Sequence, residues 1–176
     1  SSGAIRYKSR NVNQYDPSRL RREVSYVLQK PYLFSSTVRE NLEYSYQVWN
    51  QQPDGQEISF YLDRVNLPAD ILEKSRNAIS GGEQQRIALV RSLLAKPQIL
   101  LLDEVTASLD ETNTLLLEGL ILSEQRTRSL TIFFISHQPV QLHRLARTVL
   151  YLEAGRLGFQ GSVDEFSKQR GGLIHE

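Results

Sequence analysis

The pattern of apolar and polar positions divides the chain into two kinds of segment. Short runs that are almost entirely apolar, at residues 99–102 and 130–136, are typical of parallel strands covered on both faces. Longer stretches carry apolar residues three and four positions apart, which is the spacing of one helix face. Because both kinds occur along the chain, the sequence predicts an α/β fold with a mostly parallel sheet and flanking helices.

Residues 80–94 carry the clearest helix signals. Ser80 and Glu83 have the S-x-x-E spacing of a capping box, so a helix is expected to begin there. Apolar residues at helical spacing follow, and Pro97 cannot continue the helix. The predicted strand 99–102 comes next.

This layout suggests two chemical roles. The amides of Gly81 and Gly82 at the helix start would form an anion site, because unpaired N–H groups and the helix dipole favour negative charge. Asp103 and Glu104 follow the predicted strand at its carboxyl end, where open α/β sheets bind ligands. An acidic pair in that place suits Mg²⁺ with a phosphate group and an activated water.

The same signals predict the remaining elements and their grouping. Strands are expected at 3–8 and 23–28, helices at 18–22, 37–42, 58–65, 70–74, 111–124 and 141–146, a hairpin of 149–152 and 157–160, and a last short helix capped by Ser162. We therefore predict a single domain, 1–176. Residues 35–93 would form a helical subdomain inserted into an α/β part made of 1–34 and 94–176.

Composition excludes several classes. A length of 176 residues suits one domain, and a net charge of +1 gives no argument for binding nucleic acid or an anionic membrane. With no cysteine, the chain has neither a disulfide framework nor a Cys-ligated metal site. No apolar run approaches the roughly 18 residues that cross a bilayer, and no signal peptide is visible, so a membrane role would act through a partner.

Two polar residues stand where predicted strands end. Gln29 follows strand 23–28, and its amide oxygen could coordinate a metal ion or a water. His137 follows strand 130–136, about 33 residues after Glu104. Taken alone, each would be a solvated strand-end side chain; at the same sheet edge as the acidic pair, each becomes a candidate for the site.

Three motifs resemble those of ATP-binding cassette (ABC) ATPases. Residues 79–86 (ISGGEQQR) resemble the signature motif, with Ile79 where leucine is more usual. Residues 100–104 resemble the Walker B strand and catalytic glutamate, and residues 107–110 resemble the D-loop. The resemblance covers nearly the whole chain and implies a P-loop NTPase-type core with a helical insertion. It extends weakly to short stand-alone subunits linked to iron or other metal export.

The resemblance implies a role for each candidate residue, with ATP and Mg²⁺ as the cofactors. Glu104 would polarise the attacking water, and Gln29 and His137 would complete the surroundings of the γ-phosphate. Asp103 and Gln29 would hold Mg²⁺. In this family each ATP is sandwiched between two subunits arranged head to tail. The residues implied to face the partner's ATP are Ser80, Gly81, Gly82 and Gln84, and Asp110 is implied to cross the dimer interface.

A crowded aromatic segment allows two interpretations. Tyr44, Tyr46, Val48 and Trp49 fall within a short span of the predicted helical subdomain. In ABC ATPases this region carries the groove that receives a helix of the membrane subunit, so these side chains would line it. Alternatively, they are ordinary core of a small helical unit.

One expected motif is absent. None of the glycines is followed by lysine, so the phosphate-gripping G-x-x-x-x-G-K-[ST] loop (Walker A) does not occur in these 176 residues. The resemblance places that loop and the first strand ahead of a sequence like residues 2–5, so we expect an N-terminally truncated domain.

Three hypotheses remain. The first is the ATP-hydrolysing subunit of an ABC transporter, dimerising with a second copy and bound to a membrane-spanning subunit at the cytoplasmic face of the membrane. The second is a non-catalytic interaction or dimerisation module that does not bind ATP alone. The third, a soluble ABC ATPase of DNA repair or translation, is disfavoured because the sequence shows neither a long coiled-coil insertion nor tandem cassettes.

Overall fold

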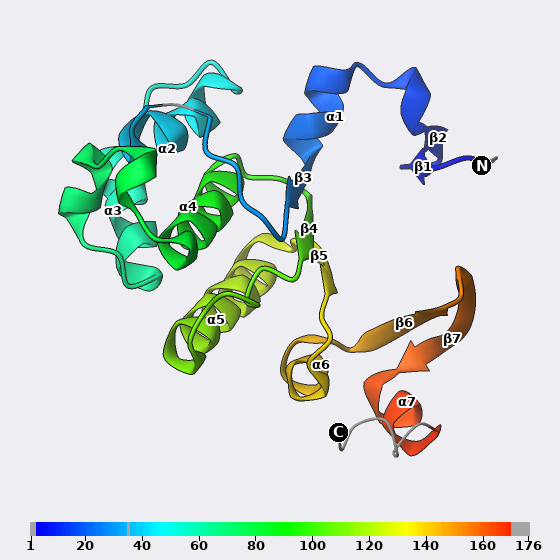
Figure 1. The fold of residues 1–176 in the computed structure, drawn as a ribbon. Helices are drawn as coiled ribbons and strands as arrows, with labels where there is room; N and C mark the ends of the chain where they lie inside the picture. Colours follow the sequence, from blue (N-terminus) through cyan, green and yellow to red (C-terminus); the bar gives the residue numbers. More distant parts are fainter. Residues whose placement is uncertain (1–2, 35, 170–176) are drawn as a thin grey trace. The chain divides into compact units, whose positions relative to one another are not determined.

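A computed structural model describes residues 3–34 and 36–169. The chain forms two compact units, Ser1–Phe134 and Ile135–Glu176, which are described separately. Figure 1 shows the strands and helices of each unit in chain order.

The first unit contains the predicted parallel strands. β3 (Val24–Val27) pairs in parallel with β4 (Ile99–Asp103), in a register that runs from Val24 opposite Ile99 to Val27 opposite Leu102. β5 (Thr131–Ile135) follows β4 in the strand order. The parallel sheet with flanking helices predicted from the sequence is therefore confirmed.

The prediction of cover on both faces is wrong for strand 130–136, and strand 99–102 has one buried and one half-buried face. Tyr26 on β3 is 52% exposed and Phe133 on β5 is 50% exposed, whereas Val27 and Leu102 are buried. The burial of β4 alternates along the strand because one face packs into the helical core and the other does not. A uniformly apolar sequence does not distinguish a strand covered on both faces from a strand covered on one.

Helices begin where the sequence offers a cap. α2 (Val38–Gln47) starts with a capping box between Thr37 and Glu40, and α4 (Gly81–Leu94) starts with the predicted one between Ser80 and Glu83. Asp residues cap the other helices of this unit: α1 (Pro17–Glu23), α3 (Gly55–Arg64) and α5 (Glu111–Arg128). The shorter elements are β1 (Arg6–Tyr7), β2 (Arg10–Asn11) and 3₁₀ turns at Val12–Gln14, Ala69–Glu73 and Arg76–Ala78.

α4 lies at the centre of the core of this unit. Nine of its fourteen residues are buried, so it has no wide polar face. It packs against α2 and α3 on the helical side and against β3 on the sheet side. One continuous apolar cluster joins α4 to Leu100 and Leu102 of β4 and to Leu117 and Leu120 of α5. The helical insertion and the sheet therefore share a single core.

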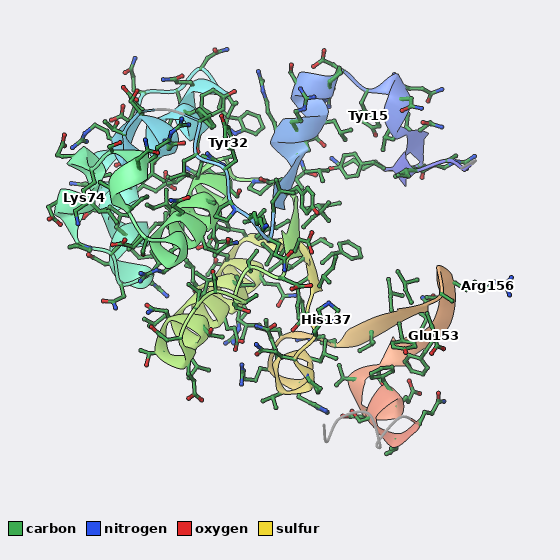
Figure 2. The ribbon with its side chains drawn as sticks, viewed as in Figure 1. Tyr15, Tyr32, Lys74, His137, Glu153 and Arg156 are labelled. Carbon is green, nitrogen blue, oxygen red and sulfur yellow. The ribbon has the colours of Figure 1, made fainter. Side chains whose placement is uncertain are left out.

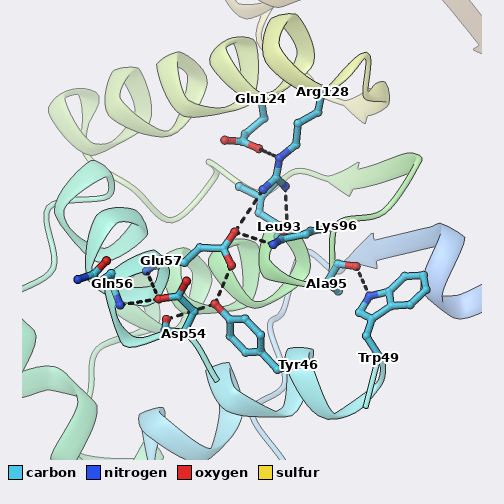
Figure 3. A network of polar contacts seen from close by, with 10 residues as sticks. All are labelled: Tyr46, Trp49, Asp54, Gln56, Glu57, Leu93, Ala95, Lys96, Glu124 and Arg128. Atoms are coloured by element: carbon cyan, nitrogen blue, oxygen red, sulfur yellow. Dashed lines mark hydrogen bonds and ion pairs between the residues drawn. The ribbon is translucent and has the colours of Figure 1, made fainter. Parts of the chain in front are cut away.

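A carboxylate ties α3 to the carboxyl-terminal ends of α4 and α5 (Figure 3). Glu57 lies 3.1 Å from the Lys96 ammonium and 3.5 Å from the Arg128 guanidinium. The Tyr46 hydroxyl donates to the same carboxylate at 2.9 Å, and burial raises the pKa of Tyr46. Trp49 donates its indole N–H to the Ala95 carbonyl at 2.6 Å. Tyr46 and Trp49 thus contribute to internal packing.

A second cluster fixes the amino-terminal segment. The buried Glu23 carboxylate accepts hydrogen bonds from Lys8 at 2.9 Å, from the Tyr7 hydroxyl at 2.8 Å and from Arg19 at 3.1 Å. These bonds favour the charged form, so the pKa of Glu23 falls from 4.5 to about 2. The residues around β1 are thereby held against the end of α1.

The second unit is a hairpin with two short helices. β6 (Thr148–Glu153) and β7 (Arg156–Ser162) are antiparallel, and the turn residues Ala154 and Gly155 both have positive φ. This confirms the predicted hairpin. α6 (Pro139–Leu145) precedes it and α7 (Val163–Gln169) follows it, with Ser162 and Glu165 bonded as a cap. Val149, Val163 and Phe166 form a small apolar cluster.

Across the described parts of both units, every helix is too short or too polar to cross a lipid bilayer.

Candidate functional site

Two side-chain pairs meet where β3 and β4 end. The Gln29 amide nitrogen donates to Glu104 Oε2 at 2.7 Å, and the Tyr26 hydroxyl donates to Asp103 Oδ2 at 2.7 Å. The parallel register brings these residues together although more than seventy positions separate them along the chain. The sequence predicted that Gln29, Asp103 and Glu104 lie at one edge of the sheet, and the structure brings them there.

Tyr26 is a member of this group that sequence analysis did not single out. It pairs with Leu101, and Asp103 lies two residues further along β4, so the Tyr26 ring and the Asp103 carboxylate share one face of the sheet. The hydrogen bond to Asp103 raises the pKa of the Tyr26 hydroxyl. The parallel register, had it been inferred, would have identified this contact.

The backbone of Glu104 lies in the left-handed region, with φ of 47°. Residues other than glycine rarely adopt this conformation, and strained positions of this kind cluster at functional sites. The turn that follows is firmly held, because Val105 and Thr106 are buried directly after it. The strain turns the chain away from the sheet immediately after the two acidic residues.

The oxygen donors at this edge fit a magnesium ion. Mg²⁺ binds through one or two carboxylates together with phosphate oxygens and water, and it does not need a complete protein cage. Asp103 would supply a carboxylate and Gln29 its amide oxygen, which is not used in the bond to Glu104. Within residues 3–34 and 36–169 there is no cluster of three or more acidic or histidine side chains that would form such a cage.

The loop before α4 presents small residues at a capped helix start. Ser80 Oγ accepts the Glu83 amide at 3.3 Å, and the Glu83 carboxylate accepts the Ser80 amide at 2.7 Å, which lowers the pKa of Glu83. Gly81 is exposed, with open space where a Cβ would be. A Cβ on Gly82 would lie 3.2 Å from Leu109, so the glycine permits close approach of residues 108–109.

Gln84 and Asp110 hold local structure on either side of this loop. The Gln84 amide donates to the carbonyls of Arg76 and Ile79, at 3.4 and 3.3 Å. Asp110 caps α5 by accepting the backbone and side-chain N–H groups of Asn113, both at 2.8 Å, and these bonds lower its pKa. A role for either residue toward a partner's ATP or across a dimer interface stays a prediction.

Arg86 joins the loop to its surroundings from inside the core. It is 9% exposed, and its Nη1 donates to the Val65 and Asn66 carbonyls at 2.9 and 3.0 Å and to Asn113 Oδ1 at 2.8 Å. Burial lowers the pKa of the guanidinium. One side chain thereby fixes the end of α3 and the start of α5 against α4.

The segment between β3 and α2 is held by side chains rather than by a strand ladder. Arg91 donates to the Tyr32 carbonyl at 2.9 Å, and Arg76 donates to the Leu33 carbonyl at 2.7 Å. The Tyr32 ring is exposed (Figure 2), and the Phe34 and Tyr44 rings, whose centroids are 4.6 Å apart, are partly exposed. These three residues thus present exposed aromatic rings on this segment and on α2.

His137 belongs to the second unit, where it is exposed and follows β5 (Figure 2). Its predicted role beside the γ-phosphate stays a prediction, as do the catalytic and metal-binding roles of Gln29, Asp103 and Glu104.

Comparison with known proteins decides the family. The family model described as "ABC transporter" matches residues 1–107, which is more than half of the chain. The chain belongs to the ABC transporter family. The match includes the signature loop and the Asp103–Glu104 pair, and the region covered is part of the ATP-binding domain.

Two similar proteins come from a bacterium and from a plant. The probable iron export ATP-binding protein FetA of Escherichia coli is 35% identical over 149 residues, covering 85% of this chain and 66% of FetA. Protein STAR1 of rice (Oryza sativa subsp. japonica) is 34% identical over 155 residues, covering 88% of this chain and 45% of STAR1. The chain thus spans less than two thirds of the length of either relative.

Solved structures agree on the fold. The ABC chain aligns with a bacterial Atm1-family ABC exporter with ATP bound at a TM-score of 0.83 and 23% identity, covering 98% of this chain and 31% of the exporter chain. It aligns with the dimeric ATP-binding cassette MJ0796, bound to ADP and Pi, at a TM-score of 0.79 and 22% identity, covering 93% and 74% of the two chains. The α/β ABC ATPase fold is therefore shown.

Proposed function

We propose that this chain is part of an ATP-hydrolysing subunit that powers an ABC transporter. The observation that carries the proposal is the hydrogen bond from Gln29 to Glu104 beside Asp103. It supports an arrangement in which Glu104 acts as general base toward a water that Gln29 orients. Asp103 and Gln29 hold Mg²⁺, which, when bound, neutralises charge on the phosphate oxygens. The place of His137 beside the γ-phosphate, which rests on the family resemblance alone, is part of the same proposal.

The proposed active assembly is a head-to-tail homodimer. Ser80, Gly81 and Gly82 present helix-start amides, which favour an anion, to the ATP held by the other copy. Gln84 supports that loop, and Asp110 lies at the interface. The solved structure of the cassette MJ0796 is dimeric, which supports dimerisation as a precedent.

The proposed membrane contact is the exposed aromatic surface formed by Tyr32, Phe34 and Tyr44. Exposed aromatic residues that lie close together are typical of protein interaction sites. A membrane-spanning subunit docked there would hold this chain at the cytoplasmic face of the membrane. The chain supplies the energy of transport, and the membrane subunit selects the substrate.

The test is Glu104→Gln in the natural protein that contains this sequence. The amide keeps the size of the side chain and removes the base, so ATP turnover should fall by about 10²–10⁴-fold while ATP-dependent dimers accumulate. Asp63→Asn, an exposed change on α3, is the control and should leave turnover unaltered. Undiminished turnover in Glu104→Gln would refute the assignment of the base.

A second candidate function, for the 176-residue chain taken by itself, is docking without nucleotide binding. None of the ten glycines in the chain precedes a lysine, so the 176 residues include no Walker A loop to grip the phosphates of ATP. Titrating the 176-residue chain with labelled ATP separates the two functions. Micromolar binding excludes the second function, and no detectable binding supports it.

A further inference from the structure

Gln85 is a buried polar side chain that none of the proposed chemistry uses. It lies on α4 with no exposed surface. Its amide nitrogen donates to the Leu28 carbonyl at 3.2 Å. Because that carbonyl can only accept, the nitrogen must face Leu28 and Oε1 must point away.

The other half of this amide is unsatisfied. Within the described part of the chain, Gln85 Oε1 is buried and has no hydrogen-bond partner. A buried acceptor left unpaired costs free energy, whereas leucine would fill a similar volume without that cost. A position that served packing alone would therefore be better occupied by leucine. The hydrogen bond to Leu28 is the feature that only the glutamine provides.

Leu28 is the residue through which β3 leads into Gln29. The last registered pair of β3 and β4 joins Val27 to Leu102, so Leu28 lies just beyond the paired part of the strand. The next side-chain anchors of this segment are on the carbonyls of Tyr32 and Leu33. Gln85 therefore holds the backbone directly before Gln29.

We propose that Gln85 is a positioning residue for Gln29. By holding the Leu28 carbonyl it sets the direction in which the chain leaves β3, and thereby keeps the Gln29 amide within 2.7 Å of Glu104. The consequence for turnover rests on the proposed ATPase function; the consequence for the Gln29–Glu104 contact does not. α4 thus carries the signature loop at its start and, in its second turn, the Gln85 side chain that holds the backbone before Gln29.

The first measurement is made on the 176-residue chain and needs no ATP. The side-chain amide signals of Gln29 are assigned in NMR spectra by their loss in Gln29→Ala. In Gln85→Leu they should move toward the positions that they take in Glu104→Ala, where the carboxylate is missing. Ser45→Ala is the matched control, because it removes another buried bond to α4, from Ser45 Oγ to the Arg91 carbonyl at 2.7 Å. The Gln29 signals should stay in place in that control.

The second measurement is ATP turnover in the natural protein. Gln85→Leu should lower kcat by about 10- to 100-fold and change KM by less than about threefold, because misplaced reacting groups slow the chemical step rather than binding. The change removes the unpaired Gln85 acceptor but also takes a donor from the Leu28 carbonyl, so the melting temperature should stay close to that of the unmutated protein. Ser45→Ala should leave kcat unchanged.

Each alternative outcome has a distinct meaning. The positioning role would be overturned if the Gln29 signals did not move, or if turnover stayed full although they moved. A clearly lower melting temperature of Gln85→Leu would also overturn it, because that result would show a structural role. Gln85→Met, which also lacks the amide donor, repeats both measurements in case the leucine variant does not fold. If the unmutated natural protein hydrolyses no ATP, the proposed function fails, and the NMR result still decides whether Gln85 positions Gln29.

Discussion

Replacing Arg86 by methionine should destabilise the first unit far more than replacing an exposed arginine does. Methionine keeps most of the length of the side chain and removes every donor. The Val65 and Asn66 carbonyls then lose a charged partner inside the core. Asn113 loses one as well, at the start of α5.

The expected magnitude follows from these contacts. Each buried carbonyl left unsatisfied costs about 1–3 kcal/mol. Removing a guanidinium whose pKa is already lowered by burial recovers part of that cost, because the charge no longer has to be desolvated. We therefore expect the free energy of unfolding to fall by about 2–4 kcal/mol.

Urea unfolding followed by tryptophan fluorescence is the assay. Trp49 is the only tryptophan, and it lies in the first unit with its N–H on the Ala95 carbonyl, so its signal reports that unit. With a slope of about 2 kcal/mol per molar urea, the midpoint should fall by about 1–2 M. Arg64→Met is the control. Arg64 is exposed and lies 5.0 Å from the centre of the Phe60 ring, so its loss should cost less than about 0.5 kcal/mol. Equal midpoint shifts in the two variants would refute the role given to the buried contacts.

Two further predictions concern stability. Because the pKa of Glu23 is about 2 in the folded chain against 4.5 unfolded, its contribution should be complete above pH 4.5 and disappear as the pH falls toward 2. Glu23→Gln should flatten that part of a plot of urea midpoint against pH, and an unchanged plot would contradict the assignment. Gly81→Ala should raise the free energy of unfolding by up to about 1 kcal/mol, since open space surrounds the position of the new Cβ. Gly82→Ala should lower the free energy of unfolding, because its Cβ would lie 3.2 Å from Leu109. A Gly82→Ala chain more stable than the Gly81→Ala chain would contradict both expectations.

The sequence predicted the features that depend on near neighbours. The capping box of Ser80 and Glu83 lies within four residues, and the turn between β6 and β7 lies within two. Both signals act before any tertiary contact forms, so both predictions are confirmed. The parallel sheet also followed from the sequence, because apolar runs separated by helices favour parallel pairing.

Other features could not be predicted because they depend on register. The bond from Gln85 to Leu28 spans 57 residues and that from Tyr26 to Asp103 spans 77. A shift of one position along β3 would turn Tyr26 to the other face of the sheet. Likewise, the exposure of Phe133 depends on what packs against each face, and an apolar run is the same in both cases.

At Glu104, the left-handed backbone favours glycine, whereas the proposed chemistry needs the carboxylate. Glycine there would relax the main chain, since it adopts positive φ without a steric penalty, and would remove the carboxylate that accepts from Gln29. A screen for tougher variants would accordingly favour glycine at this position, whereas a screen for the reaction would discard it. Relaxing the backbone at this position would therefore abolish the proposed site.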